Sequence, residues 1–124
     1  GQATLDREAE RLAALLESAR AQSRASGVAV RWRVTPDGPG NFSFDGLPPG
    51  ALPTHWLSGG ISAQPIGVDG RAAGALQLGP DPIIAAAQTA SSNATRLLLA
   101  MPLSFASGRS LAADSPKPLR ATDR

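Results

Sequence analysis

His55 is the single histidine of the chain and the side chain best suited to acid–base chemistry near neutral pH. A hydrolase built on this imidazole would need a nucleophile and an orienting carboxylate within hydrogen-bond reach. No Ser or Asp stands at a spacing from His55 that marks such a set, and the residue lies in a Pro-rich segment beside Trp56. We therefore predict no catalytic residue, with a small hydrolase using His55 as an alternative.

The acidic and glycine-rich segments also lack the spacing of a known ligand site. Asp37, Asp45 and Asp69 each precede a glycine, which is the chemistry of a turn and does not match a calcium-binding loop. The glycines at 38–40 and 59–60 lack the order of a phosphate-binding loop. The chain has no cysteine, which excludes disulfides and thiolate metal sites. We predict no metal and no cofactor.

The charged residues are nearly balanced, with 12 basic and 10 acidic side chains and a net charge of +2. Basic and acidic residues alternate through the N-terminal segment, so no basic stripe of the kind that binds nucleic acid is visible. Arg31 and Arg33 share one face of a predicted strand, where they either contact phosphate or an acidic partner or form an ordinary solvated face. We expect no nucleic-acid partner.

An amphipathic helix is predicted for residues 4–26, because apolar side chains recur there at steps of three and four residues. Gly27 is the expected end, since glycine takes the left-handed cap conformation at little cost. The stripe would pack on the chain's own sheet or against helices of neighbouring subunits. Its members are Leu5, Ala9, Leu12, Leu15, Leu16 and Ala19.

The pattern changes to a period of two after Gly27, which predicts a strand over 28–34. A turn cluster at 36–40 leads to a second strand over 41–45, and the two should pair as a hairpin. Further strands are predicted over 61–68, 73–78 and 96–101, whereas residues 83–90 stay ambiguous between helix and strand. One helix followed by antiparallel strands is an α+β fold. We expect one globular domain over 1–106 and a disordered tail over 107–124.

The loop 46–60 is rich in Pro and Gly and carries His55, Trp56 and Leu57 together. We consider two roles for Trp56 on an equal footing, and one of them is an exposed contact at the centre of a partner surface. In the other, Trp56 pins the loop to the core. His55, Leu57, Arg31 and Arg33 complete the predicted partner surface.

Three stretches, taken together, resemble the minor pseudopilin H family of the bacterial type II (general) secretion system. The first comprises LDREAERLAALL at 5–16 and ARAQSRASG at 19–27, followed by the strand through Trp32. The second is FSFDGLPPG at 42–50, which runs on to Trp56 and Leu57. The third is LQLGPDPII at 76–84. They fall in the family's order and cover residues 5 to about 84.

The resemblance implies a pilin-like fold and assembly near the tip of a short periplasmic pseudopilus. The implied partners are other minor and major pseudopilins and the secreted substrate, and the implied role is to help folded proteins cross the outer membrane. Neither a cofactor nor a catalytic residue is implied. The implied location is the periplasm, in a protein anchored in the bacterial inner membrane.

Two departures from the family bear on these expectations. The peptidase cleavage site and the apolar first half of the family's helix are missing, so no membrane anchor or assembly glutamate can be transferred to a residue here. We expect the chain to be the periplasmic part of a longer protein, starting where the helix leaves the membrane, with Gly1 left by a tag. Leu97–Ala100 resembles part of the family's final strand, whereas the continuation from Met101 does not match.

A related class is the minor pilin of type IV pili, including one that binds DNA through Arg31, Arg33 and basic residues of the tail. It shares the expected fold, and salt-dependent DNA binding would distinguish it. A small periplasmic hydrolase using His55 is the alternative from a different class. Loss of a measured activity in His55→Ala would be needed to support it.

Overall fold

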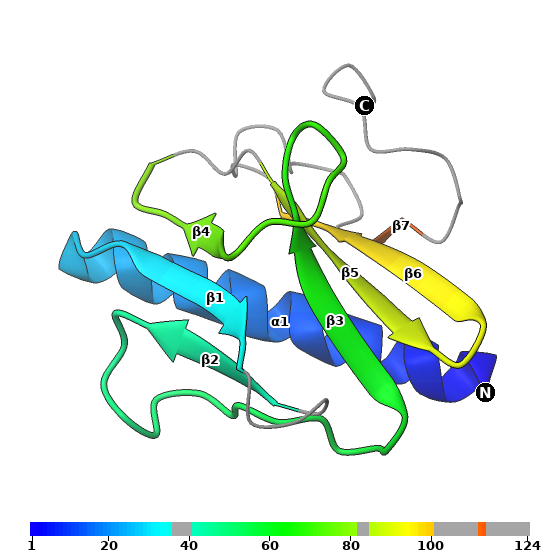
Figure 1. Cartoon of the computed structure of the whole chain (residues 1–124). Coiled ribbons are helices and arrows are strands. Elements are labelled where there is room, and N and C mark those ends of the chain that lie inside the picture. Colours follow the sequence, from blue (N-terminus) through cyan, green and yellow to red (C-terminus); the bar gives the residue numbers. More distant parts are fainter. Residues whose placement is uncertain (36–40, 82–84, 101–111, 114–124) are drawn as a thin grey trace.

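The computed structural model describes residues 1–35, 41–81, 85–100 and 112–113. The chain begins with one long helix, α1 (Gln2–Ser26), and continues in strands that form two antiparallel sheets, ordered β2-β1-β4 and β3-β5-β6-β7. Both sheets lie on the same side of α1 (Figure 1). This arrangement confirms the predicted α+β class. The strands are β1 (Val30–Val34), β2 (Phe42–Asp45), β3 (Ile61–Ile66), β4 (Leu76–Leu78), β5 (Ala86–Ser91), β6 (Ala94–Leu99) and β7 (Ala112–Ala113).

Helix α1 buries the predicted stripe against the chain's own sheets. All members of the stripe are buried except Leu15, which is half-buried, and Ser23 extends the buried line by one turn. Each buried leucine side chain contributes about 1.5–3 kcal/mol of gross hydrophobic stabilisation. Gly27 ends the helix as predicted, with φ 75° and its N–H donating to the carbonyl of Ser23 at 2.8 Å. The intramolecular alternative for the stripe is therefore confirmed.

The first sheet contains the predicted hairpin, in which β1 and β2 pair antiparallel with Trp32 opposite Phe44. Strand β1 starts at Val30, two residues later than predicted. The reason lies in the exit from α1: the Ser23 hydroxyl donates to the carbonyl of Val28 at 2.6 Å, and the N–H of Val28 donates to the Ser26 hydroxyl at 3.1 Å. These bonds keep residues 28–29 in the turn, and the Val28 side chain is 51% exposed.

The second sheet differs from the prediction in its boundaries. Strand β3 ends at Ile66 because the N–H of Gly67 donates to the carbonyl of Arg71 at 2.8 Å and starts a tight reversal. The predicted strand over 73–78 is shortened to β4, because the N–H of Ala73 donates back to the carbonyl of Pro65 at 2.9 Å. Strand β6 begins at Ala94 and ends at Leu99, two residues earlier at each end than predicted.

Strand β5 resolves the ambiguity for residues 86–90, whereas residues 83–84 of that segment lie outside the described residues. It lies between β3 and β6 in the second sheet and pairs antiparallel with both along its whole length. Its residues AAQTAS are mostly small, so neither a helical nor a strand period stands out. The segment forms a strand because pairing on both edges gives its backbone N–H and C=O groups hydrogen-bonding partners.

Four aromatic side chains gather at the inner face of the first sheet. Phe42 is the centre of this group, with ring centroids 5.8 Å from Trp32, 5.9 Å from Phe44 and 5.1 Å from Trp56. The Phe42–Trp56 and Phe42–Phe44 pairs have edge-to-face geometry, which aromatic rings prefer over a face-to-face sandwich. Trp56 thereby joins the loop 46–60 to the core.

The predicted tail over 107–124 lies outside the described residues except for Ala112–Ala113. These two residues form β7 and pair with β6, with Ala112 opposite Leu98. The edge of β6 offers this short strand its hydrogen-bonding partner, and the disorder predicted for the tail stays a prediction. The C-terminal bound of the predicted domain, 106, also lies outside the described residues.

Candidate functional site

Near its C-terminal end, the loop 46–60 is held against the rest of the protein by contacts of three consecutive residues. Thr54 accepts a hydrogen bond from the N–H of Phe42 at 2.9 Å, and His55 forms an isolated antiparallel bridge with Asn41. Trp56 is 9% exposed and packs edge-on against Phe42. The hypothesis that Trp56 is an exposed contact is therefore wrong, because the ring is part of the core.

An ion pair on α1, with a buried glutamate and a partly exposed arginine, reinforces this attachment. The Arg11 guanidinium donates from Nη1 to the carbonyl oxygen of His55 at 3.0 Å and lies 3.5 Å from Oε1 of Glu8. The side chain of Glu8 is only 6% exposed, so its charge depends on Arg11 for compensation. The sequence analysis missed both residues. Their spacing of three on one helix was the only available signal.

Leu57 is the exposed apolar residue of this loop, a property that the sequence analysis considered for Trp56. It follows the buried tryptophan directly and is 68% exposed, while the preceding His55 is exposed as well. Within the described residues, the His55 imidazole makes no hydrogen bond to a carboxylate or hydroxyl. The exposed part of the predicted loop surface thus consists of His55 and Leu57, held in place by the tryptophan between them.

The other predicted surface residues lie on β1, on the face that turns away from α1. Arg33 binds the carboxylate of Asp45 on β2 through two nitrogens, with Nε–Oδ2 at 2.6 Å and Nη2–Oδ1 at 3.3 Å. The Ser43 hydroxyl donates to Oδ1 of Asp45 at 3.2 Å. The hydrogen bond from Arg33 is the main reason that the pKa of Asp45 lies below its ordinary value, with partial burial opposing it. The same hydrogen bond raises the pKa of Arg33.

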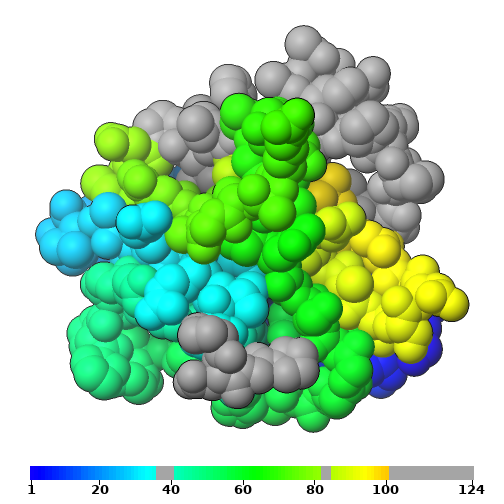
Figure 2. Space-filling model, in the orientation of Figure 1, coloured from blue at the N-terminus to red at the C-terminus, as the bar shows by residue number. Residues whose placement is uncertain are grey.

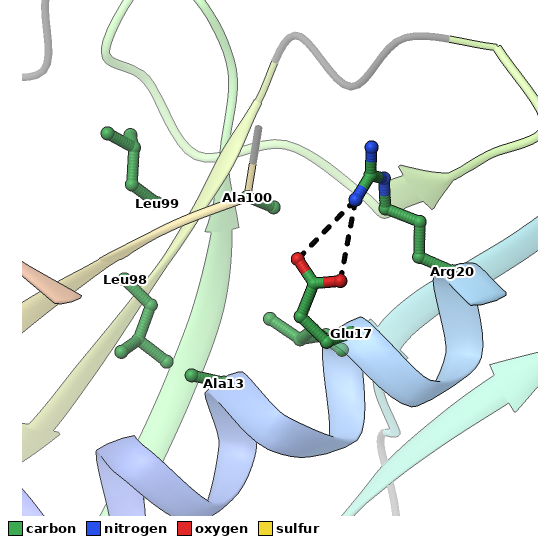
Figure 3. A pocket seen from close by; sticks show the side chains of 7 residues that line it. Ala13, Glu17, Arg20, Leu98, Leu99 and Ala100 are labelled. Carbon is green, nitrogen blue, oxygen red and sulfur yellow. Dashed lines mark hydrogen bonds and ion pairs between the residues drawn. The ribbon is translucent and has the colours of Figure 1, made fainter. Parts of the chain in front are cut away.

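A small pocket lies between the C-terminal half of α1 and the end of β6 (Figure 3). Its volume of about 10 Å³ leaves room for about one water molecule. Beside it, Glu17 and Arg20 also border a shallower hollow of about 220 Å³. Arg20 Nη1 lies 3.4 Å from both carboxylate oxygens of Glu17. Both spaces are smaller than the roughly 300 Å³ of a typical ligand pocket, and we assign neither a ligand.

Within the described ranges, no group of three or more His, Asp or Glu side chains is placed to hold a metal ion. Of the predicted site residues, the fold brings Arg31 and Arg33 together on one strand and keeps His55, Trp56 and Leu57 in one loop. In the described part of the chain, no helix combines the length and apolar character needed to cross a membrane. No protein-family model, curated protein or solved structure matched the sequence in our comparisons.

Proposed function

We propose that this chain is the periplasmic part of a minor pseudopilin, a structural subunit of the type II secretion pseudopilus. The observation that carries the proposal is the long N-terminal helix α1 lying across two antiparallel sheets and burying its apolar stripe on them. This is the architecture expected from the sequence resemblance over residues 5 to about 84. A pilin-like subunit of this kind works by assembly and needs no catalytic group.

The helix surface supports an assembly role. One side of α1 is buried by the sheets, while Arg7, Glu10, Ala14 and Ala21 remain exposed along the opposite side. The mixed charges and small alanines on this line suit contact with a neighbouring helix, since small residues allow close approach and opposite charges pair across helices. In the proposed filament, α1 packs against other subunits while the loop 46–60 and the outer faces of the sheets meet tip subunits or the secreted protein.

Binding to purified periplasmic domains of the other pseudopilins tests the proposal. The unaltered chain is expected to bind at least one other minor pseudopilin domain in a pull-down and in calorimetry. Leu57→Ser is expected to weaken that binding if the loop surface takes part, with Val68→Ser as the matched control, because Val68 is 70% exposed on a different loop. Both variants should keep the far-UV circular dichroism spectrum of the unaltered protein.

The outcome that contradicts the proposal is absence of binding to every pseudopilin domain. Salt-dependent binding to DNA in its place would favour a minor pilin of type IV pili, because phosphate contacts release counterions. Restoration of secretion in a strain lacking its minor pseudopilin, by a gene encoding this domain behind a membrane anchor, would support the proposal in cells.

A further inference from the structure

On the outer face of the first sheet, the side chains of Arg31 and Arg33 and of the residues paired with them across the strands are all polar. On this face Arg31, in the central strand β1, stands opposite Asp45 on β2 and Gln77 on β4. These three residues are exposed, whereas Arg33 and Ser43 in the next row are half-buried. Side chains of β1 reach the surface on the side of the molecule opposite α1 (Figure 2).

The two arginines of this face have different partners. Asp45 is directly opposite Arg31, yet both of its carboxylate oxygens are bound by Arg33, which lies diagonally across the pair of strands. Within the part of the chain that the structure describes, Arg31 makes no hydrogen bond or ion pair. The face therefore presents two guanidinium groups and one carboxylate, and the carboxylate is already engaged.

We propose that Arg31, with the Gln77 amide beside it, is the contact of this face for a carboxylate side chain of a neighbouring subunit. The proposal rests on the proposed function and names the chemistry of its partner. The supporting argument is charge complementarity: the face has one positive charge in excess at its centre, which a carboxylate of the partner would neutralise. A guanidinium also matches a carboxylate with two parallel hydrogen bonds, and an adjacent amide donates a third.

The arrangement makes opposite predictions for two neighbouring residues. Arg31→Ala removes the contact and is expected to weaken binding to the pseudopilin domain about fivefold, in the range of an ion pair at an interface rim. Arg31→Glu adds repulsion and should weaken it by at least about tenfold. Asp45→Asn releases Arg33 from its partner, which gives the face a second free cation, so binding should tighten about twofold or more.

The experiment measures the dissociation constant of each variant by calorimetry, against the pseudopilin domain that binds the unaltered chain. Arg71→Ala, an exposed arginine in the reversal after β3, is the control for a general loss of positive charge and should leave the constant unchanged. A purely structural role of Asp45 would not produce tighter binding. The far-UV spectrum and melting temperature identify any variant that fails to fold, and Arg31→Lys then replaces Arg31→Ala as a weakening variant.

Two results overturn the inference, and they differ from each other. If the unaltered chain binds a pseudopilin domain and the Arg31 and Asp45 variants bind equally well, the inference fails while the proposed function stands. If the unaltered chain binds no pseudopilin domain, the proposed function fails and the inference fails with it. Weaker binding of the Arg31 variants together with tighter binding of Asp45→Asn supports the inference.

Discussion

Arg11 on α1 donates a hydrogen bond to the backbone carbonyl of His55, which lies 44 residues further along the chain, at 3.0 Å. The same guanidinium compensates the buried carboxylate of Glu8. One side chain thus joins the first helix to the loop that carries the exposed Leu57. The orientation of the loop surface depends on this contact and on the burial of Trp56 beside it.

Arg11→Ala is expected to lower the free energy of unfolding by about 2 kcal/mol, because it removes a hydrogen bond from a charged donor and leaves Glu8 buried without compensation. Urea denaturation measures the change. Arg7→Ala is the control, since Arg7 is exposed on the same helix, and it should change stability by less than about 0.5 kcal/mol. The double variant Glu8→Gln/Arg11→Ala should recover part of the loss. An equal loss in Arg7→Ala would contradict the role of Arg11.

Truncation of the neighbours Trp56 and Leu57 should lower the stability of the protein to very different extents. Trp56→Ala removes a ring from the aromatic group around Phe42 and is expected to cost about 3–5 kcal/mol of stability. Leu57→Ala should cost less than about 0.5 kcal/mol, because the side chain is 68% exposed. Thermal and urea unfolding of both variants check this pair. A stable Trp56→Ala protein would mean that the tryptophan is not the anchor of the loop.

Gly46→Ala tests a close approach between two backbones. Gly46 has φ 101°, and an added methyl group would collide with the carbonyl oxygen of Ala29 at the start of the first sheet. The variant is expected to lose more than about 2 kcal/mol, from a left-handed backbone conformation together with the displacement of residue 29. Gly50→Ala is the matched control, with φ 80° and open space around the added methyl group. Its loss should be only about 1 kcal/mol, from conformation alone.

The carboxylate of Asp45 should titrate below its ordinary pKa in the folded protein, because it accepts hydrogen bonds from Arg33 and Ser43. Since the folded pKa is the lower one, the pairing stabilises the protein above the unfolded pKa of about 3.9 and loses its effect as pH falls through the folded pKa. A titration followed by NMR on the Asp45 side chain measures the value. Arg33→Ala should raise the pKa of Asp45 back towards normal, and added salt should raise it in part, since the pair is exposed.

The sequence predicted the elements with strong periodicity and left the segment of β5 undecided. The helix stripe from Leu5 to Ala19 and the alternation around Trp32 are local patterns, so both elements were predicted with the correct type. Strand β5 is built from small residues and shows no period, and only its two neighbours in the sheet establish it. The strand ends differ from the predicted ends because of hydrogen bonds that close turns between strands. One example is the bond from the N–H of Ala73 to the carbonyl of Pro65.

For the surface residues, too, some properties follow from local sequence patterns and others only from tertiary contacts. The sequence by itself determined that the helix has an apolar side, that Arg31 and Arg33 share one face of a strand, and that Trp56 and Leu57 are neighbours in one loop. These properties follow from the fixed periods of helices and strands. Only the tertiary structure decided that Trp56 is buried while Leu57 is exposed. It also decided that Asp45 is bound by Arg33, which leaves Arg31 without a partner among the described residues. Burial and ion pairing depend on which segments meet in space, and residues far apart in sequence contribute those contacts.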